Sequence, residues 1–326
     1  MRQIRSQLLG TGYSLPSKVM TNDDLSRIVD TSDEWISTRT GIKSRHIAAE
    51  NEYTSALCVK AANKAIKNSG LKIEDIDFII VATVTPDNTF PSTAAKVGKL
   101  LGIKSGAAAM DVNAACSGFV YAAQIADNMI RLGQIKTALV IGAETLSKIT
   151  DWTDRNTCVL FGDGAGAAVF SGYEASGDNT DKGILATKIY SDASHYDTLC
   201  SDSGVSINQK SGYIHMDGKE VFRMAIPALV QGVEDTLKLA NLTSTDINWY
   251  IPHQANFRII DSVAKKLDLP MEKVIVTVDH HGNTSAASIP LALAESIENG
   301  KIKTGDIIAI SSMGAGFTWG GIIIRI

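Results

Sequence analysis

The sequence predicts an α/β fold that contains two copies of one structural unit, with mixed sheets sandwiching helices. The first observation is a repeat, since Gly133-Gln-Ile-Lys-Thr137 recurs as Gly300-Lys-Ile-Lys-Thr304, 167 residues later. Two weaker matches lie in the same chain order, 71–79 with 242–250 at an offset of 171 and 97–101 with 263–267 at an offset of 166. Three matches at nearly one offset indicate a duplication.

Helical and strand patterns also alternate in both halves, as βαβ units require. The order helix, strand, helix, strand, helix, strand is expected at 54–69, 77–83, 92–101, 107–112, 117–132 and 138–143, and again at 221–240, 248–252, 255–267, 273–277, 286–299 and 306–311. Asn22 and Thr54 are expected as helix N-caps, and Thr31 with Glu34 as a capping box. No linker separates the halves, so 1–172 and 173–326 are expected to form one compact body.

Composition excludes several classes of protein. Hydrophobic residues make up 44% and charged residues 20%, and no apolar run approaches the roughly 20 residues of a membrane span. Because the N-terminus lacks the apolar segment of a signal peptide, a cytoplasmic enzyme is expected. A net charge of −4 argues against nonspecific nucleic-acid binding. The four cysteines are isolated and His280 is merely adjacent to His281, so neither disulfides nor a metal are expected.

Three reactive residue types follow predicted strands. Cys116 plus the offset of 167 gives Asn283, and both precede a predicted helix. His253 directly follows the strand at 248–252. Because open α/β sheets place reacting groups at the carboxyl ends of strands, these three side chains are expected to share one cleft.

Each of these residues also has an ordinary structural interpretation. A buried cysteine is usually a small apolar residue, which is the interpretation preferred for Cys58, Cys158 and Cys200. Cys116 is favoured as a nucleophile, because a helix N-terminus lowers the pKa of a thiol. Asn283 alone also fits a turn, since Gly-Asn is a common turn dipeptide. His46, His195 and His215 are assigned no role.

Two glycine-rich segments have different expected roles. The segment 162–168 loosely matches a dinucleotide fingerprint but leads into a predicted strand, so nucleotide binding there is rejected. The segment 314–320 follows a strand, and its backbone N–H groups suit an oxyanion hole. A plain hairpin fits 314–320 equally well.

Six segments resemble β-ketoacyl-acyl-carrier-protein synthase III, the initiating condensing enzymes of bacterial fatty-acid synthesis in the thiolase superfamily. The segments are Ser32-Asp-Glu-Trp-Ile-Ser-Thr-Arg-Thr-Gly-Ile42, Asn113-Ala-Ala-Cys-Ser-Gly-Phe119, Phe161-Gly-Asp-Gly-Ala-Gly166, Pro252-His-Gln-Ala-Asn256, Gly282-Asn-Thr-Ser-Ala-Ala-Ser288 and Gly316-Phe-Thr-Trp-Gly320. The resemblance runs essentially end to end. It implies a thiolase-like, duplicated five-layer αβαβα fold and a homodimer.

The resemblance also implies a Cys-His-Asn triad of Cys116, His253 and Asn283. Cys116 would take an acyl group from acyl-CoA, which is a substrate, so that no cofactor is needed. Malonyl-acyl-carrier protein would then lose CO2 while His253 and Asn283 hold its thioester oxygen. Backbone N–H groups of Cys116 and Ala315 would form the oxyanion hole, although the family usually has glycine at the position of Ala315.

The remaining implied roles concern binding. The residues implied to bind CoA are Thr31, Trp35, Arg39, Arg155, Gly218, Phe222 and Asn256, with Trp35 and Arg155 sandwiching adenine. Phe90 would reach across the dimer to cap the partner's acyl pocket, or pack in the core. The expected carrier-docking patch comprises Arg223, Gln254, Arg258, Lys265 and Lys266, and an ordinary solvated helix face is its alternative.

Other functions remain open at this stage. A starter enzyme for a polyketide or alkylquinolone pathway would keep the same three residues but use another acyl group or nucleophile. A noncatalytic acyl-CoA-binding protein should have lost some of them. No feature of the sequence favours a thioesterase that uses Cys116. The acyl primer itself is not predicted, because one or two methylenes change binding by only about 1–3 kcal/mol.

Overall fold

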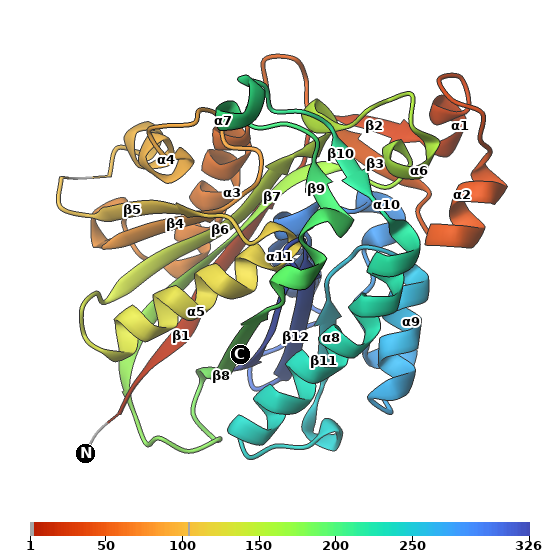
Figure 1. Ribbon diagram of the computed structural model, residues 1–326. Helices are drawn as coiled ribbons and strands as arrows, with labels where there is room; N and C mark the ends of the chain where they lie inside the picture. The colour runs from red at the N-terminus through yellow and green to blue at the C-terminus, as the bar shows by residue number, and fades with distance from the viewer. Residues whose placement is uncertain (1–2, 104) are drawn as a thin grey trace.

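A five-stranded mixed sheet is built from the first part of the chain. The computed structural model describes residues 3–103 and 105–326. The strand order is β1, β7, β6, β4, β5; β4 runs parallel to β5 and β6, whereas β7 is antiparallel to β1 and β6 (Figure 1). The bounds are β1 (Gln3–Ser14), β4 (Phe78–Ala82), β5 (Ala108–Val112), β6 (Thr137–Thr145) and β7 (Asp163–Ala175).

A second mixed sheet repeats this topology. Its order is β11, β12, β13, β8, with bounds β11 (Trp249–Pro252), β12 (Ile307–Gly314), β13 (Thr318–Arg325) and β8 (Gly183–Ser191). The pair β11–β12 is parallel and the other two pairs are antiparallel. These strands therefore occupy the places of β4, β6, β7 and β1 in the first sheet, as a duplication requires.

The predicted strand at 273–277, the counterpart of β5, is wrong. Within this segment only Val274 forms a bridge, to Tyr250. The carbonyl of Ile275 and the N–H of Thr277 bond to the side-chain amide of Gln254 instead, at 3.1 and 2.8 Å. The amide of Gln254 therefore occupies backbone groups that would otherwise bond to a neighbouring strand.

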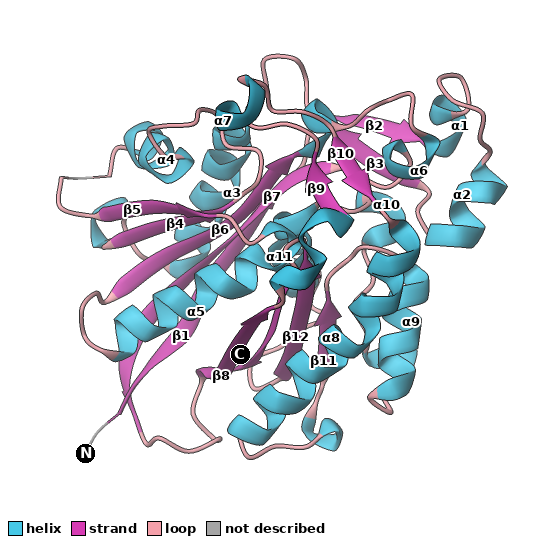
Figure 2. Cartoon of the chain, in the orientation of Figure 1, coloured by secondary structure: helices cyan, strands magenta, loops and turns pink. Residues whose placement is uncertain are grey.

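Helices complete five layers, in the order αβαβα. Apolar residues of α5 (Gly118–Arg131) and α11 (Ser288–Glu298) share one core with strands of both sheets, so these two helices lie between the sheets (Figure 2). The outer face of the first sheet is covered by α3 (Thr54–Ser69) and α4 (Thr93–Leu101). The outer face of the second is covered by α8 (Gly218–Leu239) and α9 (Phe257–Lys266). The predicted fold class is confirmed.

The glycine-rich segment 162–168 enters β7, as expected, rather than a helix. Its glycines allow close packing between β7 and α11. A Cβ atom on Gly166 would lie 2.4 Å from the carbonyl carbon of Pro290, inside α11. The segment thus serves the contact between a sheet and a central helix.

The helix caps differ from the predicted ones. The helix α1 (Asn22–Leu25) is capped by Thr21, and α3 begins after Tyr53. Asn22 and Thr54 are buried, and their side chains bond to the carbonyls of Ile42 at 2.7 Å and Thr85 at 2.6 Å. Because these two side chains already donate to backbone carbonyls elsewhere in the fold, they do not cap a helix.

The expected capping box at the second helix is also displaced. For α2 (Asp33–Thr40) the cap is Ser32, whose hydroxyl accepts from the N–H of Trp35. The helix therefore starts one residue later than a box of Thr31 and Glu34 requires.

Short elements gather at one end of the two sheets, at the top of Figure 1. They are β2 (Lys18–Thr21), β3 (Ser44–Ile47), β9 (Leu199–Ser201), β10 (Ile214–Met216), α1, α2, α6 (Arg155–Cys158), α7 (Val205–Asn208) and α10 (Val278–His281). Across residues 3–103 and 105–326, no helix has both the length and the apolar character needed to cross a bilayer.

Candidate active site

Cys116 lies in a 3₁₀ turn, η2 (Ala115–Ser117), that leads directly into α5. Its carbonyl accepts a hydrogen bond from the hydroxyl of Ser312 on β12 at 2.7 Å. A Cβ atom on Gly314 would lie 2.5 Å from the N atom of Cys116, so only glycine permits this approach. The second half of the chain thus fixes the backbone of a residue from the first half.

The thiol of Cys116 is buried, and this burial raises its pKa to about 12. A thiolate loses hydration in such a site, and the desolvation outweighs the lowering effect of a hydrogen bond from Ser285. Burial of the thiol therefore opposes the lowered pKa that was expected at the start of α5.

His253 follows β11, and its N–H donates to the carbonyl of Ser311 at 2.8 Å. Its Nδ1 lies 2.7 Å from the hydroxyl of Ser288, the first residue of α11. The hydroxyl of Ser288 also accepts from the N–H of Gln254 at 3.4 Å, and in one of the two neutral tautomers of His253 it donates its own proton to Nδ1. This tautomer leaves a proton on Nε2. Burial lowers the pKa of His253 to about 3, so the ring is neutral.

Asn283 is held by backbone and side-chain bonds. Its N–H donates to the carbonyl of Leu160 at 2.9 Å, and its carbonyl accepts from Gly162 at 3.0 Å. Its Oδ1 accepts from the N–H of Ser285 at 2.9 Å. The amide oxygen is thereby engaged, which leaves the amide NH2 group as a donor for the pocket.

The pairing of Cys116 with Asn283 by an offset of 167 does not describe the local structure. Ala115 and Ser285 both have left-handed backbones, with φ of 45° and 49°. They begin two matching 3₁₀ turns, η2 and η7 (Ser285–Ala287), so the local offset is 285 − 115 = 170. The counterpart of Asn283 is then Asn113, whose Oδ1 accepts from Ala115 in the same way. The two residues do meet, but not as equivalents.

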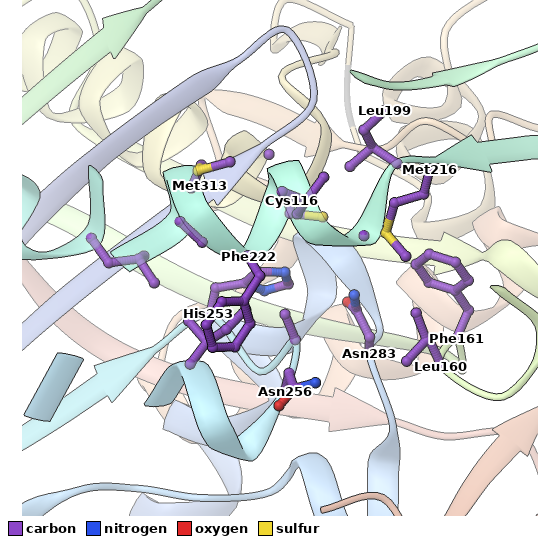
Figure 3. Close-up of a pocket in the computed structure, with 17 residues that line it drawn as sticks. Cys116, Leu160, Phe161, Leu199, Met216, Phe222, His253, Asn256, Asn283 and Met313 are labelled. Carbon is purple, nitrogen blue, oxygen red and sulfur yellow. The ribbon is translucent and has the colours of Figure 1, made fainter. Parts of the chain in front are cut away.

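Cys116, His253 and Asn283 line one narrow cavity of about 100 Å³, in which Figure 3 shows their side chains converging. Its walls are largely apolar, and the other lining residues are Leu160, Phe161, Leu199, Met216, Gly218, Val221, Phe222, Ala225, Leu229, Ala255, Asn256, Ile259, Met313 and Gly314. The three side chains therefore meet in one pocket as predicted, although only Cys116 and His253 follow strands and Asn283 follows α10.

A second, wider cavity of about 470 Å³ also reaches Cys116. Ala315 lines it, in the loop between β12 and β13, and so do Tyr196, Leu199 and Ile214. Ala315 is not among the residues with positive φ, so its methyl group fits an ordinary backbone. Cys116 therefore lies where a narrow channel meets a wider, mainly apolar chamber.

The residues expected to bind adenine contact one another. The guanidinium carbons of Arg39 and Arg155 lie 4.6 and 4.9 Å from the ring centroid of Trp35. Arg155 also donates to the carbonyl of Asp30 at 2.9 Å. The hydroxyl of Thr31 is buried and has no partner among the described residues. A flat base entering between Trp35 and Arg155 would have to displace the guanidinium.

Three further residues of the expected CoA set lie along the narrow channel. Gly218 and Phe222 begin α8 and line the cavity, as does Asn256. Asn256 caps α9 through its Oδ1, and its Nδ2 donates to the carbonyl of Arg39 at 3.0 Å. The channel therefore runs from Cys116 toward the arginine and tryptophan cluster.

Phe90 lies apart from both cavities. Its side chain is 83% exposed in the single chain, and it is not among the residues that line either cavity. Core packing, its alternative interpretation, is wrong.

Four of the five expected docking residues are accessible cations. Arg258 lies over the ring of Phe222 at 5.5 Å, beside the channel. Arg223 pairs with Glu220, and Lys265 pairs with Asp261 at 2.6 Å. Lys266 is exposed one residue further along α9.

Gln254 is the exception. It is 1% exposed, and its amide bonds to the carbonyls of Pro252 and Ile275 and to the N–H groups of Thr277 and Val278. Gln254 is thus inaccessible to a docking protein, and its role is to hold the chain around His253.

Sequence reasoning missed Ser288 and Ser312, the two hydroxyls that hold His253 and Cys116. Serines of this kind carry no signal in a single sequence, because each acts on a residue far away along the chain. The apolar walls contributed by β9 and β10 were also missed, since short strands of three residues give no clear periodicity.

Comparisons with known proteins identify relatives that match along the chain. Residues 110–193 match the family model of 3-oxoacyl-[acyl-carrier-protein] synthase III, and residues 237–326 match its C-terminal model. The β-ketoacyl-[acyl-carrier-protein] synthase III of Rhodospirillum centenum is 56% identical over 99% of both chains.

Solved structures show the same relationship. The 3-oxoacyl-[acyl-carrier-protein] synthase III of Aquifex aeolicus is 48% identical, with a TM-score of 0.92 over 98% of this chain and 100% of that one. A priming β-ketosynthase of the R1128 polyketide pathway has the same TM-score of 0.92 but is 32% identical, over 99% of this chain and 97% of that one. The chain belongs to the β-ketoacyl-[acyl-carrier-protein] synthase III family.

Proposed function

We propose that this chain is the condensing enzyme that initiates fatty-acid synthesis. It loads a short acyl group from acyl-CoA onto Cys116 and condenses that group with malonyl-acyl-carrier protein. The observation that carries the proposal is the meeting of Cys116, His253 and Asn283 in one buried cavity, in a member of this family. In the family of initiating condensing enzymes, a cysteine, a histidine and an asparagine act together in one reaction.

In the first half-reaction, the sulfur of Cys116 attacks the thioester carbon of acyl-CoA. The bond from that carbon to the CoA sulfur breaks, and the thiol proton leaves Cys116 and ends on CoA. The tetrahedral oxyanion accepts from the backbone N–H groups of Cys116 and Ala315, which line the same wider cavity. The wide cavity receives the acyl chain, and the primer is a short chain whose identity is left open.

In the second half-reaction, malonyl-acyl-carrier protein enters the narrow channel. Its thioester oxygen accepts from Nε2–H of His253 and from the amide NH2 of Asn283. These donors stabilise the enolate as the bond to the carboxylate breaks and CO2 leaves. The enolate carbon attacks the acyl carbonyl, the bond to Cys116 breaks, and the released thiolate takes up a proton. A neutral His253 suits this role, since burial keeps its pKa at about 3.

CoA binding extends along the narrow channel to the surface. Gly218, Phe222 and Asn256 would contact the pantetheine arm. The adenine would stack on Trp35 after displacing Arg155, with Arg39 and Thr31 beside it. An indole and a guanidinium plane both favour stacking with a base.

The carrier protein would dock beside the channel mouth. Arg258 is the central residue of this proposal, because its guanidinium covers the channel residue Phe222. Arg223, Lys265 and Lys266 add positive charge on α8 and α9. A cationic surface attracts an acidic carrier protein.

We also propose a homodimer formed through the edge of the first sheet. The edge strand β5 exposes Ala108, Ala109 and Met110. An uncovered edge with apolar side chains favours pairing with another strand. Phe90, which is exposed in the single chain, is the residue expected to reach the partner's acyl pocket.

The alternative of a starter enzyme for a polyketide is less favoured. The priming β-ketosynthase is 32% identical to this chain, whereas the synthase III of Rhodospirillum centenum is 56% identical.

A test separates the two half-reactions. Wild-type protein should convert acyl-CoA and malonyl-acyl-carrier protein into CO2 and β-ketoacyl-carrier protein. His253→Ala and Asn283→Ala should still be acylated at Cys116 but release CO2 about 100-fold more slowly, the usual cost of one oxyanion donor. Ser296→Ala, a buried serine elsewhere on α11, is the matched control. Wild-type rates of decarboxylation in both variants would overturn the assigned roles.

A further inference from the structure

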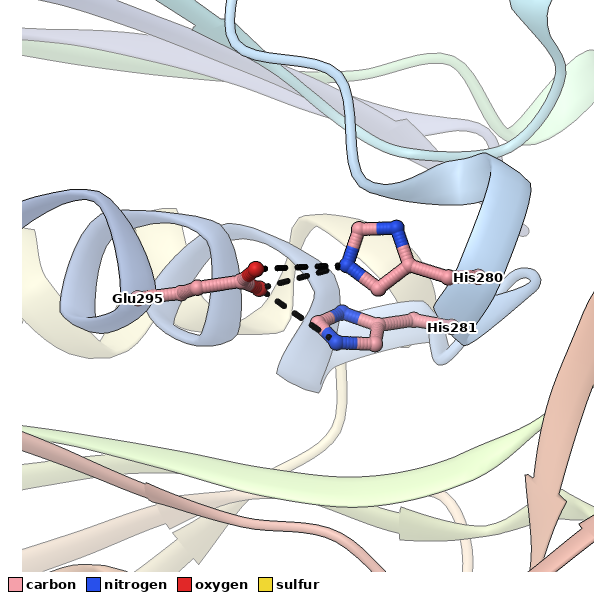
Figure 4. A group of neighbouring side chains, drawn as sticks. All are labelled: His280, His281 and Glu295. Atoms are coloured by element: carbon pink, nitrogen blue, oxygen red, sulfur yellow. Dashed lines mark hydrogen bonds and ion pairs between the residues drawn. The ribbon is translucent and has the colours of Figure 1, made fainter. Parts of the chain in front are cut away.

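Outside both cavities that reach Cys116, three potential metal ligands lie close together. His280 and His281 end α10, and Glu295 lies on α11 (Figure 4). Nε2 of His280 lies 3.3 and 3.4 Å from the two carboxylate oxygens of Glu295, and Nε2 of His281 lies 3.3 Å from Oε2. One ligand atom from each of the three residues lies within 4.8 Å of the other two.

This donor set has a definite chemical preference. Two imidazole nitrogens and one carboxylate oxygen form a common three-ligand set for Zn²⁺, with ligand distances of about 2.0–2.2 Å. A fourth position would be taken by water. Mg²⁺ and Ca²⁺ instead prefer sites made of oxygen atoms. Small side-chain rotations would bring the three ligand atoms to bonding distance, because they already face one another in Figure 4.

The surroundings support the same interpretation. Nδ1 of His280 lies 2.8 Å from a carboxylate oxygen of Asp279, and such a carboxylate orients a metal-binding imidazole and makes it more basic. His281 is 3% exposed, so its imidazole is held by the surrounding packing. Its Nδ1 is buried without a partner among the described residues, so no hydrogen bond of that atom fixes which nitrogen carries the proton.

We propose that His280, His281 and Glu295 form a binding site for one divalent transition-metal ion of the zinc class. The site is separate from the condensing chemistry, since its ligands lie outside both cavities that reach Cys116. The ion would fasten α10 to α11. Asn283 lies two residues beyond His281, and Ser288 lies about two turns before Glu295 on α11. The site therefore stabilises the segments that carry these two residues.

The test uses the full chain after removal of metals with a chelator. Calorimetric titration with Zn²⁺ at pH 8 should give one site per chain, and the melting temperature should rise with Zn²⁺ concentration. Co²⁺ should give the visible absorption of a coordinated ion. His280→Ala and Glu295→Gln should each weaken Zn²⁺ binding at least tenfold, because each removes a ligand.

The matched control is His215→Ala. His215 is a surface histidine whose Nε2 lies 3.3 Å from a carboxylate oxygen of Asp202, and this pair lacks a second imidazole. This variant should bind Zn²⁺ like the wild type. Circular dichroism and condensing activity of the metal-free variants check folding. The proposal is overturned if Zn²⁺ does not bind with one-to-one stoichiometry, or if His280→Ala and Glu295→Gln bind it as tightly as the wild type. Neither outcome bears on the condensing function, which is measured without metal.

Discussion

Among single residues, Ser288 has the clearest influence on the chemistry without touching substrate. Its hydroxyl lies 2.7 Å from Nδ1 of His253, and a hydroxyl that donates to Nδ1 favours the tautomer that carries a proton on Nε2. Ser288→Ala should therefore slow decarboxylation of malonyl-acyl-carrier protein roughly tenfold, because a buried nitrogen that loses its partner costs about 1–3 kcal/mol.

The acylation of Cys116 by acyl-CoA is the internal control for this variant, because that step of the proposed mechanism does not use Nε2 of His253. Ser296→Ala, on the same helix, should leave both rates unchanged. An equal loss in both half-reactions would mean that Ser288 acts through general stability instead.

The buried thiol makes a prediction about pH. Because burial raises the pKa of Cys116 to about 12, the thiolate fraction should rise about tenfold for each pH unit across the neutral and moderately alkaline range. Alkylation of Cys116 by iodoacetamide, followed by intact mass, should therefore accelerate without a plateau between about pH 6 and 10. A plateau below pH 8 would mean that the start of α5 stabilises the thiolate more than burial destabilises it.

Single residues also show where sequence reasoning succeeds and fails. Cys116 and His253 could be found because reactive residue types follow strands, whereas Asn283 was reached through a strand at 273–277 and an offset of 167 that the structure does not support. Gln254 was misjudged as a surface residue, since a polar side chain beside His253 resembles a docking group in sequence. Its four backbone partners come close only after folding, so the sequence around Gln254 gives no signal of these hydrogen bonds.

At the scale of elements, the positively charged face of α9 is the proposed docking surface for the carrier protein. Arg258→Glu should raise KM for malonyl-acyl-carrier protein several-fold at low salt and less at high salt, because surface charges are screened. Acylation of Cys116 by acyl-CoA should be unchanged. Lys238→Glu, near the far end of α8, is a matched charge reversal. An unchanged KM in Arg258→Glu would remove the docking proposal.

Regular elements were predictable where local preference and tertiary packing agree. The range predicted for α3 is its observed range, because an amphipathic pattern ends at Gly70, whose φ of 72° suits glycine. The segment 273–277 has a β-branched run typical of a strand, but Gln254 takes its outer hydrogen bonds. A competing side chain from elsewhere in the chain is invisible to local propensity.

For the whole molecule, the duplication predicted the two sheets and the layers between them. It did not give the correct local equivalences, because insertions change the offset from 167 in the repeated string to 170 at the active-site turns. The residues brought together at the site come from both halves, and Cys116 and Asn283 have different origins in the repeat.

The dimer proposal is tested at the same scale. In solution the mass should be about twice the chain mass of 34.8 kDa, by light scattering after gel filtration. Met110→Lys places a charge on the exposed edge strand β5 and should give monomers, whereas Leu132→Lys, at the exposed end of α5, should not. A dimer that survives Met110→Lys unchanged would contradict pairing through β5.

The most direct test of the central claim is intact-protein mass after brief incubation with a panel of acyl-CoAs, followed by malonyl-acyl-carrier protein. The account predicts that wild-type protein gains the mass of one acyl group, that Cys116→Ser gains none, and that the adduct disappears as β-ketoacyl-carrier protein forms. Failure of every acyl-CoA to form an adduct, or an adduct that malonyl-acyl-carrier protein does not discharge, would contradict it.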